Sequence, residues 1–185
     1  MSGDATDTVT VLDAEGVRTI TIDRPEARNA MTWAMRERIA QLFDGASADD
    51  AIDVVVITGV DASFSAGVDL KELRAQTGPV KRMNPTIAAR RCAKPTIAAV
   101  NGVCVTGGLE LALACDVIVA SDQARFADTH AKAGLMPGWG MSAALPTAVG
   151  RRKAVELALT GTFIDANEAL RIGLVTHVVP HDELL

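Results

Sequence analysis

The chain has 185 residues, 49% of them hydrophobic and 22% charged, so it is long enough to bury a core and fits a single domain over residues 1–185. This composition excludes a disordered chain and a small disulfide-stapled protein. The net charge of −5 and the absence of Tyr argue against a general nucleic-acid-binding protein, which needs a basic face and stacking aromatic side chains. The longest apolar runs, at 96–100 and 109–115, are far shorter than the roughly 20 residues of a membrane helix, so we expect no membrane partner.

The cysteines and the N-terminal residues bear on the cellular compartment. Cys92, Cys104 and Cys115 form neither a CxxC pair nor a metal-ligand spacing, so we expect reduced thiols, no disulfide and no metal site. Residues 1–7 are small and acidic, without the basic and apolar regions of a secretory signal. We therefore expect a cytoplasmic protein.

The first third of the chain predicts a hairpin, a helix and a strand. Apolar and polar residues alternate at 9–12 and 17–23 around an Ala-Glu-Gly turn, which is typical of a β-hairpin. Thr32 is a suitable N-cap for a helix over 33–46. The β-branched run at 54–58 predicts a strand that is buried on both faces.

The middle of the chain repeats this alternation of strand and helix. Strands are predicted at 96–100 and 117–120, and the pair Gly107-Gly108 opens a helix over 109–115. The stretch 76–85, with Gly-Pro and Asn-Pro pairs, is the most loop-like segment and the one we expect to be mobile. Strands separated by helices predict an α/β fold of stacked ββα-like turns.

The C-terminal part predicts two further helices and an extended segment. The helices lie at 151–159 and, capped by Asp165, at 166–172. Gly173 ends the second helix, and 175–179 is extended.

Two glycine-containing loops stand between a strand and a helix. In the first, Gly107 and Gly108 leave backbone N–H groups open to an anionic oxygen, although such a turn is equally often needed only for packing. The second, at 61–70, also joins a strand to a helical stretch through small residues. Two loops of this kind are more informative than one.

These loops carry a resemblance to the crotonase (enoyl-CoA hydratase/isomerase) family. The motifs that resemble the family, in its order along the chain, lie at 23–31, 64–70, 101–110, 124–128, 134–138 and 173–175. The resemblance implies a crotonase-like ββα superhelix of stacked turns, without the C-terminal helical region that the family usually carries. It also implies a homo-oligomer, a trimer or a dimer of trimers, if that region is present.

The resemblance implies a lyase that hydrates a 2-enoyl-CoA thioester in fatty acid metabolism, with coenzyme A as part of the substrate and no separate cofactor. The backbone N–H groups of Ala66 and Gly107 are the expected oxyanion hole for the thioester enolate. Glu110 matches one catalytic carboxylate of the family's hydratases, and its place in the first turn of an apolar helix is also consistent with a purely electrostatic role at the helix terminus. The expected substrate-binding residues are Arg24, Ala27, Arg28, Ala66, Gly67, Val68, Asp69, Lys71, Gly108 and Trp139.

The sequence departs from the hydratase pattern at the second carboxylate, where His130 stands. His130 can shuttle a proton and pair with Glu110, or it can be an idle structural histidine; Asp128 can orient it or replace it. Alternative functions are therefore an enoyl-CoA isomerase, a thioester or C–C hydrolase that uses His130, and a CoA-thioester-binding protein without turnover.

Overall fold

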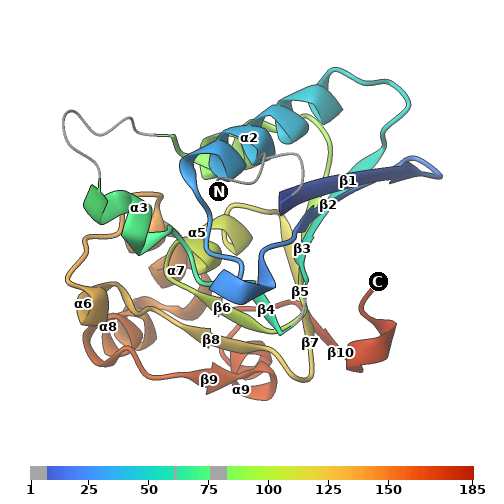
Figure 1. The fold of residues 1–185 in the computed structure, drawn as a ribbon. Coiled ribbons are helices and arrows are strands. Elements are labelled where there is room, and N and C mark those ends of the chain that lie inside the picture. Colours follow the sequence, from blue (N-terminus) through green and yellow to red (C-terminus); the bar gives the residue numbers. More distant parts are fainter. Residues whose placement is uncertain (1–7, 61, 76–82) are drawn as a thin grey trace.

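Two sheets organise the molecule, whose computed structural model describes residues 8–60, 62–75 and 83–185 (Figure 1). The larger has six strands in the order β1-β2-β3-β5-β7-β10, and the smaller has four in the order β4-β6-β8-β9. The strands are β1 (Val9–Ala14), β2 (Val17–Ile22), β3 (Val54–Gly59), β4 (Ser63–Ser65), β5 (Thr96–Val100), β6 (Val103–Val105), β7 (Val117–Ser121), β8 (Arg125–Ala127), β9 (Ile164–Asp165) and β10 (His177–Val179).

The order of the strands confirms the predicted stacked turns. After the antiparallel β1–β2 hairpin, the chain places β3, β5 and β7 side by side and parallel in the large sheet. Each of these strands is followed by a strand of the small sheet, where β4, β6 and β8 are again parallel neighbours. Strand, strand and helix thus recur as one unit, and equivalent segments of successive units lie next to each other.

The helices lie between these strands and after β8. They are α2 (Trp33–Ser47), α3 (Leu70–Ala75), α4 (Pro85–Arg91), α5 (Gly107–Ala112), α6 (His130–Ala133), α7 (Met141–Val149), α8 (Arg151–Thr160) and α9 (Ala166–Arg171), with 3-10 turns η1 (Pro25–Ala27) and η2 (His181–Glu183). As predicted, the side chain of Thr32 caps α2 and that of Asp165 caps α9. Within the described ranges, every helix is too short or too polar to cross a bilayer.

Two predicted boundaries need correction, and one helix was missed. The loop expected at 76–85 ends earlier, because Asn84 caps α4 and Pro85 fits its first turn, where no N–H is needed; residues 76–82 lie outside the described part. Helix α5 begins at Gly107 rather than residue 109. Helix α7 was not predicted because it contains Pro146, and the burial of Met141 and Leu145 offsets the lost hydrogen bond.

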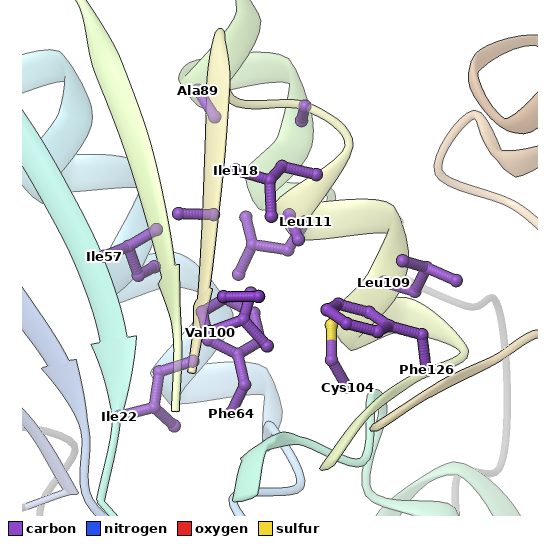
Figure 2. Close-up of a cluster of buried hydrophobic side chains, with 14 of the residues drawn as sticks. Ile22, Ile57, Phe64, Ala89, Val100, Cys104, Leu109, Leu111, Ile118 and Phe126 are labelled. Atoms are coloured by element: carbon purple, nitrogen blue, oxygen red, sulfur yellow. The ribbon is translucent and has the colours of Figure 1, made fainter. Parts of the chain in front are cut away.

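The core joins both sheets to α5 (Figure 2). Leu109 and Leu111 of this helix pack among side chains of the small sheet and the large one. The labelled small-sheet side chains are Phe64, Cys104 and Phe126, and those of the large sheet include Ile22, Ile57, Val100 and Ile118. Helix α5 is therefore held in place by side chains of both sheets.

All three cysteines are free, as expected, and burial raises the pKa of Cys115 to about 12.

Candidate active site

The two glycine-containing loops lie side by side at the ends of paired strands. Strands β4 and β6 are parallel, with Ser63 opposite Val103, so the segments that follow them emerge at the same edge. The Thr106 hydroxyl donates to the carbonyl of Ala66 at 2.6 Å and ties the two loops together. Thr106 has φ of 49°, a conformation that costs about 1–3 kcal/mol in a non-glycine residue and is often found at functional sites.

Glycine is required where the loops touch. Gly67 has φ of 93°, and a Cβ there would lie 2.7 Å from the backbone nitrogen of Gly107. A Cβ on Gly108 would lie 2.9 Å from the Cβ of Ser65. Gly67 and Gly108, which were expected to bind substrate, therefore let the two backbones approach each other.

The predicted donor Ala66 is wrong for this structure. Its N–H already donates to the carbonyl of Arg28 at 3.0 Å. Gly67 has a positive φ, which interrupts the regular alternation of backbone directions along this segment. The Met31 N–H donates to the Gly67 carbonyl, and the Met31 carbonyl accepts from the Asp69 N–H. The N–H of Val68, which lies between them, therefore points away from Met31.

Two backbone N–H groups are left open at this junction. Among the described residues, neither the Val68 N–H nor the Gly107 N–H has a hydrogen-bond acceptor. Both residues line the same pocket. The pair that fits a developing oxyanion is therefore Val68 and Gly107, and Ala66 remains a lining residue.

The pocket has a volume of about 640 Å³ and is mostly apolar. Helices α2, α3, α4, α5 and α6 and the segment before α7 contribute to its walls. The lining residues with polar or aromatic side chains are Arg36, Asn84, Thr106, Glu110, Thr129, His130 and Trp139. A concave apolar space with few polar groups is typical of a small-molecule site.

Glu110 is buried, with 2% of its surface exposed, and its two oxygens have different partners. Oε1 accepts from the backbone N–H groups of Trp139 at 2.7 Å and Met141 at 3.0 Å. Oε2 faces the Nε2 of His130 at 3.5 Å. One oxygen is therefore fixed by the backbone, and the other is directed to the pocket wall formed by His130.

His130 begins α6 and is held from the other side by Asp128. Its Nδ1 lies 2.7 Å from Asp128 Oδ1. Burial lowers the pKa of His130, but the hydrogen bonds to Asp128 and Glu110 and the charges of both carboxylates outweigh it and raise the pKa to about 9. Burial would raise the pKa of Asp128, and the bonds from His130 overcome that effect and lower it. Both carboxylates therefore favour the protonated form of the ring.

Trp139 lines the pocket where the two glycine loops meet. A Cβ on Gly107 would come within 2.9 Å of its ring. Its carbonyl accepts from the Thr86 hydroxyl at 3.0 Å and from the Arg90 guanidinium at 3.1 Å, which fixes the segment. The Arg36 guanidinium lies 5.8 Å from the ring centroid, within the range of a cation–π contact.

Other predicted binding residues make contacts within the loops rather than line the pocket. Arg24 pairs with Asp69 at 2.6 Å, and Asp69 also accepts from the Lys71 N–H at 2.8 Å. Within the described part of the chain, the pocket lining does not include Arg24, Ala27, Arg28, Asp69 or Lys71. Arg28 and Lys71 are exposed. Their contact with a CoA phosphate stays a prediction.

Sequence reasoning missed Thr106 and Arg36. The strain at Thr106 has no signature in the sequence, because threonine rarely adopts a positive φ. Arg36 could have been noticed as a charge beside the apolar positions Met35 and Ile39 of the predicted helix. No group of three or more His, Cys, Asp or Glu side chains in the described ranges is arranged to hold a metal ion.

Comparison with known proteins gives consistent matches. The family model described as enoyl-CoA hydratase/isomerase matches residues 13–185. A relative from Arabidopsis thaliana, named probable enoyl-CoA hydratase 1, peroxisomal, is 42% identical over 176 residues, which is 94% of this chain and 66% of the relative. The chain thus spans slightly less than two thirds of that relative's length.

Solved structures agree with these matches. The crystal structure of an enoyl-CoA hydratase from Mycobacterium tuberculosis H37Rv has a TM-score of 0.86 and 51% identity, covering 96% of this chain and 77% of that one. An enoyl-CoA hydratase subunit from Geobacillus kaustophilus has a TM-score of 0.90 at 32% identity, covering 96% and 70%.

Proposed function

Because the chain belongs to the enoyl-CoA hydratase/isomerase family, we propose that its pocket binds a 2-enoyl-CoA thioester and adds water across the conjugated double bond. One observation carries this proposal. The Glu110 carboxyl group and the His130 ring face each other at 3.5 Å in the pocket that also exposes the Val68 and Gly107 N–H groups. A base, an acid and two oxyanion donors thus converge on one apolar space.

Glu110 acts on water. Its Oε1 is saturated by backbone donors, so Oε2 is the atom that takes a proton from a water in the pocket. The water oxygen then forms a bond to the β-carbon of the enoyl group, and the double-bond electrons move toward the thioester carbonyl. General base catalysis of this kind contributes about 10²–10⁴-fold to rates.

The resulting enolate oxygen is bound by backbone N–H groups. Val68 and Gly107 supply them from the two loops that Thr106 ties together, so they need little reorganisation as charge develops. One such donor contributes roughly 3 kcal/mol in other enzymes. The same arrangement activates the β-carbon for attack, because negative charge on oxygen is what the addition produces.

His130 completes the addition as the acid. The imidazolium gives its Nε2 proton to the α-carbon, which yields the 3-hydroxyacyl thioester. The proton held by Glu110 then returns to the neutral imidazole across the 3.5 Å gap, and both groups regain their starting states. Water has been added in full, and no other reactant is needed.

Other expectations remain proposals. We propose that Arg24, Arg28 and Lys71 lie near the CoA moiety, that the protein is a homo-oligomer, and that it is cytoplasmic. The names of the relatives include peroxisomal and mitochondrial proteins, so the compartment needs its own measurement.

A substrate panel tests the reaction. Loss of conjugated-thioester absorbance with short and long 2-enoyl-CoAs is the expected result. A 3-enoyl-CoA that gains this absorbance would indicate isomerisation, and a saturated acyl-CoA that releases free thiol would indicate hydrolysis. Binding of every thioester without a product would contradict the proposed hydration.

A further inference from the structure

Asp128 holds His130 through two bonds that converge on one oxygen. Asp128 Oδ1 accepts from the His130 backbone N–H at 3.2 Å and contacts the ring Nδ1 at 2.7 Å. The backbone and the ring of His130 are thereby both held by the same carboxylate oxygen of Asp128. Asp128 itself is 3% exposed and lies outside the pocket lining, while His130 is part of it.

The ring has carboxylates on both sides. Asp128 faces Nδ1 from the segment before α6, and Glu110 of α5 faces Nε2. Other cations nearby are engaged elsewhere: Lys132 of α6 donates to the Gly161 carbonyl at 2.8 Å, and Arg36 of α2 pairs with Glu72 at 3.1 Å. The described groups that act on the ring charge are therefore Asp128 and Glu110, and both favour a cation.

We propose that Asp128 is a positioning residue for the hydration, which holds His130 with Nδ1–H on its carboxylate and Nε2–H directed toward Glu110 and the substrate. This inference rests on the proposed function. It deepens that function by fixing the direction of proton flow: His130 starts each cycle as the donor, and Glu110 as the acceptor. A neutral His130 with its Nε2 lone pair toward the pocket would compete with Glu110 for the proton of water.

A purely structural role makes a different prediction. Asp128 also accepts a hydrogen bond from the His130 backbone N–H, and the side-chain oxygen of Asn can accept the same bond. If that bond were its whole role, Asp128→Asn would change little. If its charge keeps the ring protonated, Asp128→Asn removes that charge while leaving the size and the backbone hydrogen bond in place. Asp165→Asn is the matched control, because Asp165 caps α9 through the Glu168 N–H at 2.8 Å and is exposed.

The test combines ring-nitrogen NMR with kinetics on the full chain. The chain has three histidines, and a His130→Gln variant assigns the His130 signals. In the wild type both ring nitrogens of His130 should be protonated at neutral pH, with a midpoint near 9. In Asp128→Asn the midpoint should move toward the ordinary 6.5.

Kinetics give the second readout. We expect kcat of Asp128→Asn at neutral pH to fall by about tenfold or more, since the acid is only partly charged, while KM changes little. The high-pH fall of kcat should begin at a lower pH than in the wild type. Asp128→Glu should keep the charged ring and recover part of kcat, and Asp165→Asn should match the wild type.

The outcomes are separable from those of the proposed function. A neutral His130 in the wild type at neutral pH, or an unchanged titration and kcat in Asp128→Asn, would overturn the positioning role. The NMR measurement reads the ring on the wild type and uses the His130→Gln variant only to assign its signals. If His130→Gln is inactive and Asp128→Asn is fully active, hydration stands and only this inference fails. If the wild type hydrates no enoyl-CoA, the proposed function fails whatever the state of the ring.

Discussion

Two pairs of basic and acidic side chains have equally short contacts but very different exposure to solvent. In α9, Arg171 binds Glu168 at 2.6 and 2.7 Å, with 70% of the Arg171 side chain exposed. In the pocket, His130 binds Asp128 at 2.7 Å, with 7% and 3% of the side chains exposed. Contact distance alone therefore does not distinguish a surface ion pair from a buried one.

Solvent makes the difference. Water and salt screen the exposed pair, so its loss affects little. The buried groups cannot exchange their partners for water, and each charge depends on the one beside it. We expect substitutions to have large effects at the pocket and small effects at α9, and the following predictions test this contrast in order of size.

The largest effect is expected for Glu110→Gln. Glutamine can still accept the Trp139 and Met141 N–H bonds through its amide oxygen, so the fold should be kept. It cannot take a proton from water, and kcat should fall by at least about a hundredfold. Steady-state loss of enoyl-thioester absorbance measures this. Glu168→Gln, in the partly exposed ion pair of α9, is the control and should retain full activity. A Glu110→Gln variant within threefold of the wild type would refute the role of Glu110 as the base.

The pH dependence of stability is expected to be the next largest effect. The folded-state pKa of His130, about 9, lies above its ordinary value of 6.5, so protonation favours the folded state. This contribution is fully present below pH 6.5 and is lost as the pH rises through about 9. Urea unfolding should show a fall of roughly 1–3 kcal/mol across that window in the wild type. His130→Gln should lack this fall, and an identical slope in both proteins would argue against the raised pKa.

A comparison of two glycines extends the contrast to the backbone. Gly108→Ala places a Cβ 2.9 Å from that of Ser65, whereas a Cβ on the exposed Gly138 meets nothing within 4 Å. We expect Gly108→Ala to cost roughly 1–3 kcal/mol of unfolding free energy. Gly138→Ala should stay within about 0.5 kcal/mol of the wild type. Equal midpoints in denaturant for the two variants would mean that the loops do not pack as closely as described.

The smallest effect is expected for Arg171→Ala. The ion pair with Glu168 is exposed, so removal of the guanidinium should leave the melting temperature close to that of the wild type. The comparison should be made at low and high salt. A marked loss of stability, greater at low salt, would show that the surface cluster contributes more than its exposure implies.

Much of the fold was predictable from local pattern. The β1–β2 hairpin, the cap at Thr32 and the cap at Asp165 follow from residue types that have strong local preferences. Helix α7 was not predictable, because it contains Pro146 and depends on the tertiary burial of Met141 and Leu145 rather than on local helix propensity. The exact start of α5 depends on Thr106, the residue before it, which has a strained φ of 49°.

The residues of the site were predictable from the sequence, but the hydrogen bonds between them were not. The motifs identified Glu110, His130 and Gly107, and the structure brings all three to one pocket. The donor on the other loop was assigned to Ala66. In the structure the Ala66 N–H donates to the Arg28 carbonyl, and the positive φ of Gly67 that accompanies this bond could not be predicted from the sequence. The link from Asp128 to His130 was an open alternative, because both residues follow the end of β8 at Ala127, where strand periodicity no longer predicts side-chain directions. The turn into α6 lets them meet.

Isotope incorporation tests the proposed hydration most directly. The wild type is incubated with a 2-enoyl-CoA in water labelled with oxygen-18 and, separately, in deuterium oxide, and the thioester product is examined by mass spectrometry. The account predicts a 3-hydroxyacyl-CoA that carries the labelled oxygen on the β-carbon and one deuterium on the α-carbon. Recovery of an enoyl-CoA that has gained deuterium but no labelled oxygen would contradict hydration, because the enolate would then form without addition of water.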